Sequence, residues 1–258
     1  MASDTAPDLE LLQFIHSHFN EKARWALDHK GLPHRRTSLL PGPHMPEVRK
    51  RTGQTMTPVL RIGDSYIAGS AEIIARVDSA WPENPLLPAD PALREAAAAI
   101  QQDMDSTLGP AIRHCVFAIA RNHPAFVADL MGGHLPWLKR KAYAAAVPMI
   151  LKRISAMMRL AEPDRLAEQE SRIDGAMDRI AAQAGPSGYL AGETFSAADL
   201  AAAALLSPIA RPAECQSRIV ARPPDEIAAW MARRQDHPAA QWAREMFRRH
   251  RGRSMEIA

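Results

Sequence analysis

Three hydroxyl-bearing residues stand where the chain is predicted to enter a helix or a strand: Ser17, Thr57 and Ser70. Ser17 precedes a helical pattern over residues 20–30, and Ser70 opens another over 70–80. A hydroxyl beside a helix N-terminus stabilises an anion, because the first backbone N–H groups and the helix dipole point toward it. Ser17 and Ser70 are therefore candidate anion-binding residues, although serine at such a position is also a common helix cap.

A proline stands inside a run that otherwise reads as a β-strand, Thr57-Pro58-Val59-Leu60-Arg61-Ile62. Because proline has no backbone N–H to give to a sheet ladder, it is confined to strand edges, first positions and bulges. Pro58 is therefore predicted to open the strand. A turn signal at Gly63-Asp64, a short strand over 65–68 and the helix over 70–80 follow.

The elements that must position these residues are predicted from hydrophobic periodicity and from breakers. Strands are expected at 9–14, 37–40, 57–62 and 65–68 and helices at 20–30 and 70–80, with a polar, basic stretch before Gly53. Beyond a proline-rich stretch, candidate helices lie at 91–121, 124–131, 136–160, 164–184, 196–206, 224–235 and 238–250. The expected fold class is α/β followed by all-α, with domains over 1–82 and 91–258 and a linker over 83–90.

Composition narrows the class of protein. The 258 residues can bury a sizeable core, and the net charge of +3 is too small for a protein built around nucleic acid. The longest apolar run, Leu200–Leu206, is too short to span a bilayer, and Met1–Asp4 lacks the features of a signal peptide. Cys115 and Cys215 form no Cys-x-x-Cys pair, which favours free thiols and a cytoplasmic location.

A capping box is predicted in the second half of the chain. Ser196 can cap the helix that follows, and Asp199 can reach back to the backbone N–H of that serine. Phe195 and Leu200 occupy the two positions of a hydrophobic staple. Such a box is typical of a well-defined helix start and by itself indicates no function.

Four local motifs in this order resemble the glutathione transferase superfamily. They lie at Phe14–Leu27, Thr55–Leu60, Ile67–Ile74 and Gly188–Leu200, and the resemblance spans roughly residues 9 to 250. It implies the glutathione transferase fold, an N-terminal thioredoxin-like domain followed by an all-helical domain. It also implies glutathione as co-substrate and attack by its thiolate on a hydrophobic electrophile.

The resemblance implies a catalytic role for Ser17. Serine-type and cysteine-type members carry their catalytic residue at this position, seven places before Arg24. There its hydroxyl would stabilise the thiolate, which is the reactive form of the thiol. Asn20 is the nearest alternative donor. Since Ser17 and Asn20 replace both cysteines of a redox pair, redox chemistry through a protein thiol is excluded at this loop.

Glutathione-binding residues follow from the same resemblance. Pro58 is expected to be cis, which turns the main chain of Thr57 toward the ligand. The N–H and C=O of Thr57 would then pair with the cysteinyl part of glutathione, as a sheet edge pairs with an added β-strand. Ser70 and the helix start behind it form a site for the γ-glutamyl carboxylate. Gly69 stands where an acidic residue is usual, and His44 is a candidate for the glycine carboxylate.

The electrophile pocket is expected between the domains, where ligand sites commonly form. Candidate lining residues recur at helical spacing: Met104, Leu108, Ile112 and Cys115. Such a stripe is also typical of a core. The 111–172 region is longer than a typical member needs, and its role is left open.

For two other residue clusters we expect no bound ligand. No metal is expected, since His16 and His18 have no third ligand nearby. The basic run Arg248–Arg253 is interpreted as a solvated tail. No nucleic acid or membrane partner is expected, and a homodimer is predicted from the resemblance and from apolar positions in the 70–80 and 91–121 helices.

Three functions remain in competition. The first is a serine-type glutathione transferase. The second is a glutathione-dependent isomerase or lyase, in which the thiolate adds and later leaves, so that Ser17 would serve unchanged. The third is a non-catalytic glutathione-binding module of the same fold, which Gly69 in place of an acid would favour.

Overall fold

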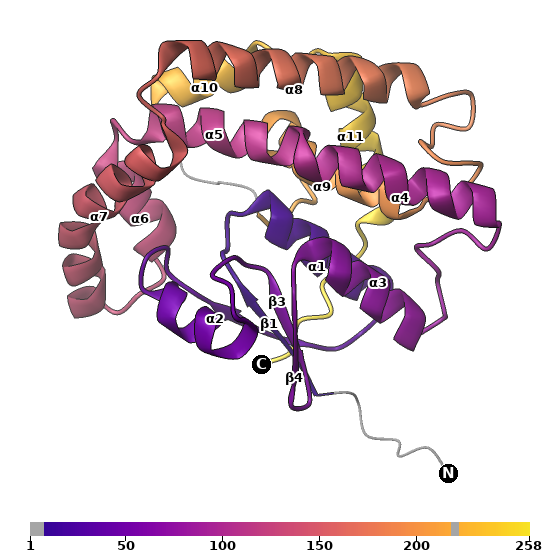
Figure 1. The fold of residues 1–258 in the computed structure, drawn as a ribbon, viewed down its shortest axis with the longest axis horizontal. Coiled ribbons are helices and arrows are strands. Elements are labelled where there is room, and N and C mark those ends of the chain that lie inside the picture. Colours follow the sequence, from indigo (N-terminus) through magenta and orange to yellow (C-terminus); the bar gives the residue numbers. More distant parts are fainter. Residues whose placement is uncertain (1–7, 218–221) are drawn as a thin grey trace.

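A computed structural model describes residues 8–217 and 222–258 of the chain, so the expectation for Met1–Asp4 lies outside the described residues. The first part contains β1 (Leu9–Gln13), α1 (His18–His29), β2 (Arg35–Ser38), α2 (His44–Thr52), β3 (Val59–Ile62), β4 (Ser65–Ala68) and α3 (Ser70–Ala80). The second contains α4 (Pro91–Ser106), α5 (Leu108–Ala120), α6 (Pro124–Gly132), α7 (Trp137–Met158), α8 (Pro163–Gln183), α9 (Ala197–Ala210), α10 (Asp225–Ala232) and α11 (Pro238–His250). The predicted fold class is confirmed, and Figure 1 shows the helical layer above the sheet.

The four strands form one sheet in the order β2-β1-β3-β4. β1 runs parallel to β2, with α1 as the crossover, and the β1–β3 and β3–β4 pairs are antiparallel. Side chains alternate between the two faces. Leu11 and Leu60 enter the main core with α1 and α3, whereas Leu12 and Val59 pack with Val48 of α2 on the other face.

Two predicted elements differ from the structure. The polar, basic stretch before Gly53 contains α2, a helix in which only Val48 is buried, so it carries almost no hydrophobic periodicity. The predicted 91–121 helix is two helices that meet at Thr107. Pro110 has no N–H to donate to the carbonyl of Ser106, which interrupts the helical ladder there.

The helix α9 is the centre of the helical part. It packs against α1, α4 and α11, and nearly all its residues are buried. The predicted capping box at its start is confirmed: Asp199 accepts the backbone N–H of Ser196 at 2.9 Å. Asp199 also accepts the N–H of Leu190 at 2.7 Å, which fixes the preceding loop.

The long 111–172 region forms most of α5, then α6, α7 and the start of α8. The helices α6 and α7 pack together and lie beside α2 in Figure 1. Tyr143 of α7 donates its hydroxyl to the carbonyl of Pro41, at 3.4 Å, and Ile150 lies against Gly42. The region therefore braces the loop before α2. Among the described residues, no helix combines the length and apolarity needed to cross a membrane.

Candidate functional site

The sheet topology brings three loops to one edge of the sheet, the edge that the ends of the strands form. β1 ends, β3 begins and β4 ends at this edge, because β3 is antiparallel to both neighbours. The loops carry Ser17, Thr57 and Ser70. The N–H of Gly69 donates to the carbonyl of Pro58 at 3.0 Å, so the start of α3 is held beside the start of β3.

Ser17 is the N-cap of α1. Its backbone is extended, with φ −94° and ψ 126°, and its Oγ accepts the N–H of Asn20 at 3.4 Å. The side chain is partly exposed. A hydroxyl that accepts one hydrogen bond still has its own proton to donate, so capping and stabilisation of an anion are compatible at this residue.

Arg24 holds the loop that carries Ser17. Its guanidinium donates to the carbonyl of Ile15 at 3.1 Å and to that of Ser17 at 3.5 Å. It also bonds the side chains of Gln13 and Glu21. All three side chains are buried. The carbonyls of Ile15 and Ser17 thus have fixed partners, and the partly exposed side chain of Ser17 stands at the start of α1.

A buried ion network extends from this point to the end of the chain. Arg251 donates to Glu21 at 2.7 Å and to Asp28 at 2.9 Å, with all three side chains 0% exposed. Burial alone would raise the pKa of Glu21, but Arg24 and Arg251 outweigh it and hold that pKa below its usual value. The solvated-tail interpretation is therefore wrong for Arg251, although Arg248 and Arg253 are exposed.

Thr57 is tied to the first turn of α1. The Thr57–Pro58 peptide bond is cis, and Asn20 donates its side-chain N–H to Oγ1 of Thr57 at 3.2 Å. Among the described residues, none hydrogen-bonds the backbone N–H or C=O of Thr57. Asn20 is 0% exposed and its amide nitrogen is engaged, so Asn20 is poorly placed as an alternative donor to a ligand.

Ser70 is the first residue of α3 and not its cap. The N-cap is Gly69, whose φ of 100° lies in the region that favours glycine. That backbone conformation explains why glycine stands where an acidic residue was expected. Ser70 is 5% exposed, and no described residue hydrogen-bonds its hydroxyl.

His44 braces the backbone. Its Nε2 lies 2.9 Å from the carbonyl of Thr55, and its Nδ1 lies 3.2 Å from that of Leu40. Burial lowers the pKa of His44. With both ring nitrogens facing carbonyls, His44 positions the loop that carries Thr57, and its predicted contact with a ligand carboxylate has no free ring nitrogen to support it.

The candidate pocket residues belong to the core, which corrects their assignment. Met104, Leu108, Ile112 and Cys115 are each 0 or 1% exposed and pack in the main hydrophobic cluster. Burial raises the pKa of Cys115 to about 12. Their helical spacing marks the inner face of α4 and α5, which packs in the core.

His16 and His18 point to different parts of the structure. Nδ1 of His16 lies 3.2 Å from the carbonyl of Ser217, and Nε2 of His18 lies 3.0 Å from that of Gly109. Burial lowers the pKa of His18 to about 4. Within residues 8–217 and 222–258, no group of three His, Cys, Asp or Glu residues is placed to hold a metal ion.

Sequence reasoning missed the residues that position the site. Arg251 and its partner Glu21 are 230 positions apart, so no local pattern in the sequence links them. One signal was present for Arg24 and Glu21: they lie three positions apart on one helix, a spacing at which opposite charges can pair. Arg251 stands beside exposed arginines, so its burial could not be recognised from the local sequence.

The fold and the site define a class: a thioredoxin-like domain joined to a helical domain, with a serine at the first loop and a proline opening β3. The family model of the glutathione S-transferase N-terminal domain matches residues 11–85, and that of the C-terminal domain matches residues 163–233. The chain belongs to the glutathione S-transferase superfamily.

Individual proteins are similar over different lengths. Glutathione S-transferase 1 of Dianthus caryophyllus is 38% identical over 93 residues, which is 35% of this chain and only 42% of that protein. A Methylobacterium radiotolerans glutathione S-transferase in complex with glutathione sulfonate has a TM-score of 0.63 at 19% identity, covering 97% of this chain and 96% of that one. The beta-etherase LigF from Sphingobium sp. strain SYK-6 has a TM-score of 0.59 at 20% identity, covering 92% and 98%. At these identities the structures show a shared fold.

Proposed function

We propose that the protein is a glutathione-dependent transferase that adds the glutathione thiolate to a hydrophobic electrophile. The observation that carries the proposal is the meeting of Ser17, Thr57 and Ser70 at one edge of the sheet. Each residue offers a group suited to a different part of glutathione. The membership of the superfamily supports the same reaction.

Each proposed role follows from the hydrogen-bond donors and acceptors of a loop that have no partner among the described residues. The hydroxyl of Ser17 and the first turn of α1 would lower the pKa of the thiol by stabilising the thiolate. The backbone N–H and C=O of Thr57 would pair with the cysteinyl unit. The hydroxyl of Ser70 and the N–H groups at the start of α3 would hold the γ-glutamyl carboxylate, at an end of a helix that favours negative charge.

Product analysis tests the proposal. Purified protein is incubated with glutathione and 1-chloro-2,4-dinitrobenzene, and with other electrophiles, and the thiol products are separated. A stable conjugate formed above the uncatalysed rate is the expected result. Free glutathione regenerated beside an altered electrophile would indicate the isomerase or lyase instead. Glutathione binding without turnover on any electrophile would leave a binding module and contradict the transferase.

Replacing Ser70 with alanine is expected to weaken glutathione binding by about 1–2 kcal/mol, the scale of a hydrogen bond to a charged group. The helix start should survive, because Gly69 and not Ser70 is its N-cap. Titration calorimetry measures the change. Ser171→Ala, on the exposed face of α8, is the matched control. Equal affinities for wild type and Ser70→Ala would remove Ser70 from the site.

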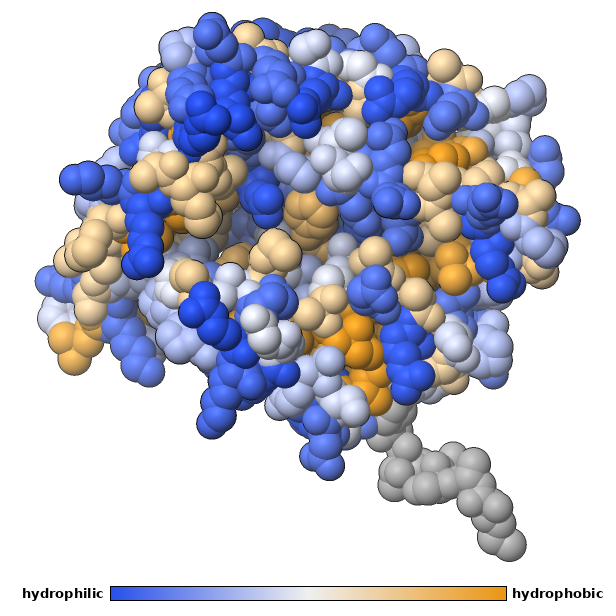
Figure 2. Space-filling model, in the orientation of Figure 1, coloured by the Kyte–Doolittle hydropathy of each residue, from blue (hydrophilic) through white to orange (hydrophobic). Residues whose placement is uncertain are grey.

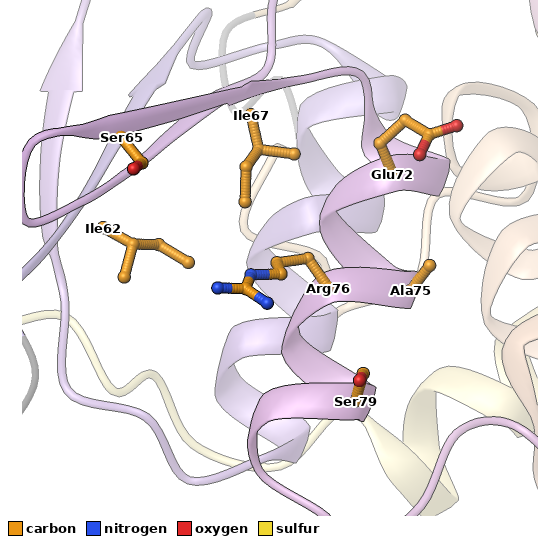
Figure 3. A pocket seen from close by; sticks show the side chains of 7 residues that line it. All are labelled: Ile62, Ser65, Ile67, Glu72, Ala75, Arg76 and Ser79. Atoms are coloured by element: carbon orange, nitrogen blue, oxygen red, sulfur yellow. The ribbon is translucent and has the colours of Figure 1, made fainter.

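We further propose that the protein is a homodimer. Of the two helical regions expected to contribute, α4 has exposed apolar side chains such as Leu93, whereas the large apolar residues of α3 are buried. Ile73, Ile74 and Val77 pack inside the protomer, so the apolar positions of α3 cannot form an interface. The outer side of α3 and the edge strand β4 instead enclose a groove of about 470 Å³ (Figure 3), where Arg76 reaches toward Ile62. An unpaired edge strand favours contact with a second chain.

Light scattering at micromolar concentration is expected to give twice the 28.4 kDa mass of one chain. An arginine placed in the groove should disturb the contact, so Ala75→Arg is expected to shift the mass toward that of one chain. Ala142→Arg makes the same change on the exposed face of α7 and should leave the mass unaltered. A wild-type mass of one chain would contradict the dimer.

A further inference from the structure

The helix α5 lies unusually close to the first turn of α1. A Cβ added at Gly109 would stand 2.5 Å from Cζ of Phe19, which is closer than any side chain tolerates. The carbonyl of the same glycine lies 3.0 Å from Nε2 of His18. Glycine at this position therefore permits the approach, and it brings the next turn of α5 over the residues that directly follow Ser17.

Arg113 lies on this next turn of α5, four positions after Gly109. Its guanidinium carbon lies 5.8 Å from the centroid of the Phe19 ring. The side chain reaches solvent, and among the described residues no carboxylate forms an ion pair with it. The surrounding protein atoms lower the pKa of Arg113, and no acidic neighbour acts against them.

The unpaired state of Arg113 is informative because other arginines near the site are paired. Arg24 bonds Glu21, Arg36 bonds Asp28, and Arg251 bonds both acids. An exposed cation that no described carboxylate neutralises can form charge-assisted hydrogen bonds to an anionic ligand.

The electrostatic surroundings agree with this. The charged neighbours that act on His18 are Arg113 and Lys22, and both lower its pKa. Those that act on His16 are Arg24 and His134, and they also lower its pKa. No carboxylate acts on either ring in the described part of the chain. Lys22 and Arg24 are themselves paired, with Asp105 and Glu21, so Arg113 is the cation of this set that no described carboxylate neutralises.

The face of α5 that carries Arg113 also carries apolar side chains. Val116 and Phe117 lie three and four positions beyond Arg113, so the three side chains share one side of the helix. Both apolar residues are partly buried and pack on the core. Figure 2 shows a recess on this side of the molecule, between the helical layer and the α/β layer.

We propose that the electrophile bears a carboxylate or another anionic oxygen group, which binds Arg113 while the apolar body of the substrate packs on Phe19. The inference rests on the proposed transferase function and names its substrate class. Arg113 acts as a specificity-determining residue. Its guanidinium can donate two parallel hydrogen bonds to a carboxylate, whereas a neutral substrate leaves it unpaired.

A matched pair of aryl chlorides tests the proposal: 4-chloro-3,5-dinitrobenzoate and 4-chloro-3,5-dinitrobenzamide. In both, the thiolate forms a bond to the carbon that bears chlorine, chloride leaves with the bonding pair, and the thiol proton goes to solvent. Wild type should prefer the benzoate. Arg113→Met should lower the benzoate-to-amide ratio of kcat/KM by about 10- to 100-fold, the range of a charge-assisted hydrogen bond.

Two further variants sharpen the result. Arg113→Lys keeps the charge and should retain part of the preference. Arg153→Met removes the same charge from the exposed side of α7 and should leave the ratio unchanged. Equal ratios for wild type and Arg113→Met would overturn the proposal, because Arg113 would then not contact the distinguishing group.

An equilibrium measurement separates this inference from the transferase function. Calorimetry with unreactive 3,5-dinitrobenzoate needs no turnover. Wild type should bind it at least tenfold more tightly than Arg113→Met does. If wild type binds it in this way but conjugates neither aryl chloride, the transferase function fails and the anion site stands. If both proteins bind it equally, the anion site fails, whatever the activity.

Discussion

Replacing Ser17 with alanine is expected to lower kcat/KM on 1-chloro-2,4-dinitrobenzene by about 10–1000-fold at neutral pH, the range for losing one well-placed donor to an anion. The hydroxyl of Ser17 accepts the N–H of Asn20 and still has a proton to donate. Without that donor, the pKa of bound glutathione should rise, so that less of it is thiolate at pH 7. Glutathione affinity should change little, because Thr57 and Ser70 provide most of the binding groups.

The deficit should shrink as pH rises, since solvent then ionises the thiol without help from the protein. A pH–rate profile of kcat/KM measures the shift directly. Ser17→Gly is the control for the capping role: glycine at an N-cap costs only a few tenths of a kcal/mol against about 1 for alanine. If the hydroxyl matters as a donor, both variants lose activity equally. If it matters only as a cap, Ser17→Gly stays active.

Ser17→Cys provides a contrast in chemistry. A thiol at this position can form a mixed disulfide with glutathione, so the variant should gain thiol-transferase activity while it loses conjugating activity. An alanine variant with full activity and an unshifted pH profile would reduce Ser17 to a helix cap. The donor would then have to be sought elsewhere, and not at Asn20, whose side chain is fully buried.

Local signals in the sequence predicted the framework of the site. Three signals depend only on residues nearby in the chain. They are Pro58 before a run of β-formers, the turn at Gly63, and Ser70 before a helical pattern. Each therefore appears in the structure close to its predicted place. The capping box at Ser196 was predictable for the same reason, because both partners lie within one turn of helix.

Long-range partners could not be predicted. The stripe of Met104, Leu108, Ile112 and Cys115 has the same helical spacing whether it faces a pocket or a core, and only the packing of neighbouring helices makes it core. Arg251 stands among exposed arginines, and nothing local shows that it alone is enclosed. Neighbouring residues of a helix or tail face different surroundings, and those depend on elements far away in the chain.

Replacing Arg251 with methionine is expected to lower the free energy of unfolding by about 3–5 kcal/mol, because breaking a buried ion pair leaves an uncompensated charge. Arg251 contacts Glu21 and Asp28, and all three are fully enclosed. Methionine keeps the length of the side chain, so little of the effect arises from lost volume. Urea denaturation should show a lower midpoint with an unchanged slope.

Arg253→Met is the matched control, since this arginine is exposed two residues further on. It should change stability by no more than about 0.5 kcal/mol, as is usual for surface positions. Equal midpoints for wild type and Arg251→Met would contradict the network's role. A lower midpoint in both variants would assign the effect to net charge and not to the buried pair.

The pH dependence of the Arg251→Met effect follows from Glu21. Arg24 and Arg251 outweigh burial and hold the pKa of Glu21 below its usual value in the folded protein. A carboxyl with a depressed folded pKa adds stability that is present above its unfolded pKa and is lost as pH falls through the folded value. The difference between wild type and Arg251→Met should therefore be full at pH 7 and shrink in acid. Because Glu21 also bonds Arg24, which holds the carbonyls before α1, the variant should loosen the loop of Ser17 before the protein unfolds.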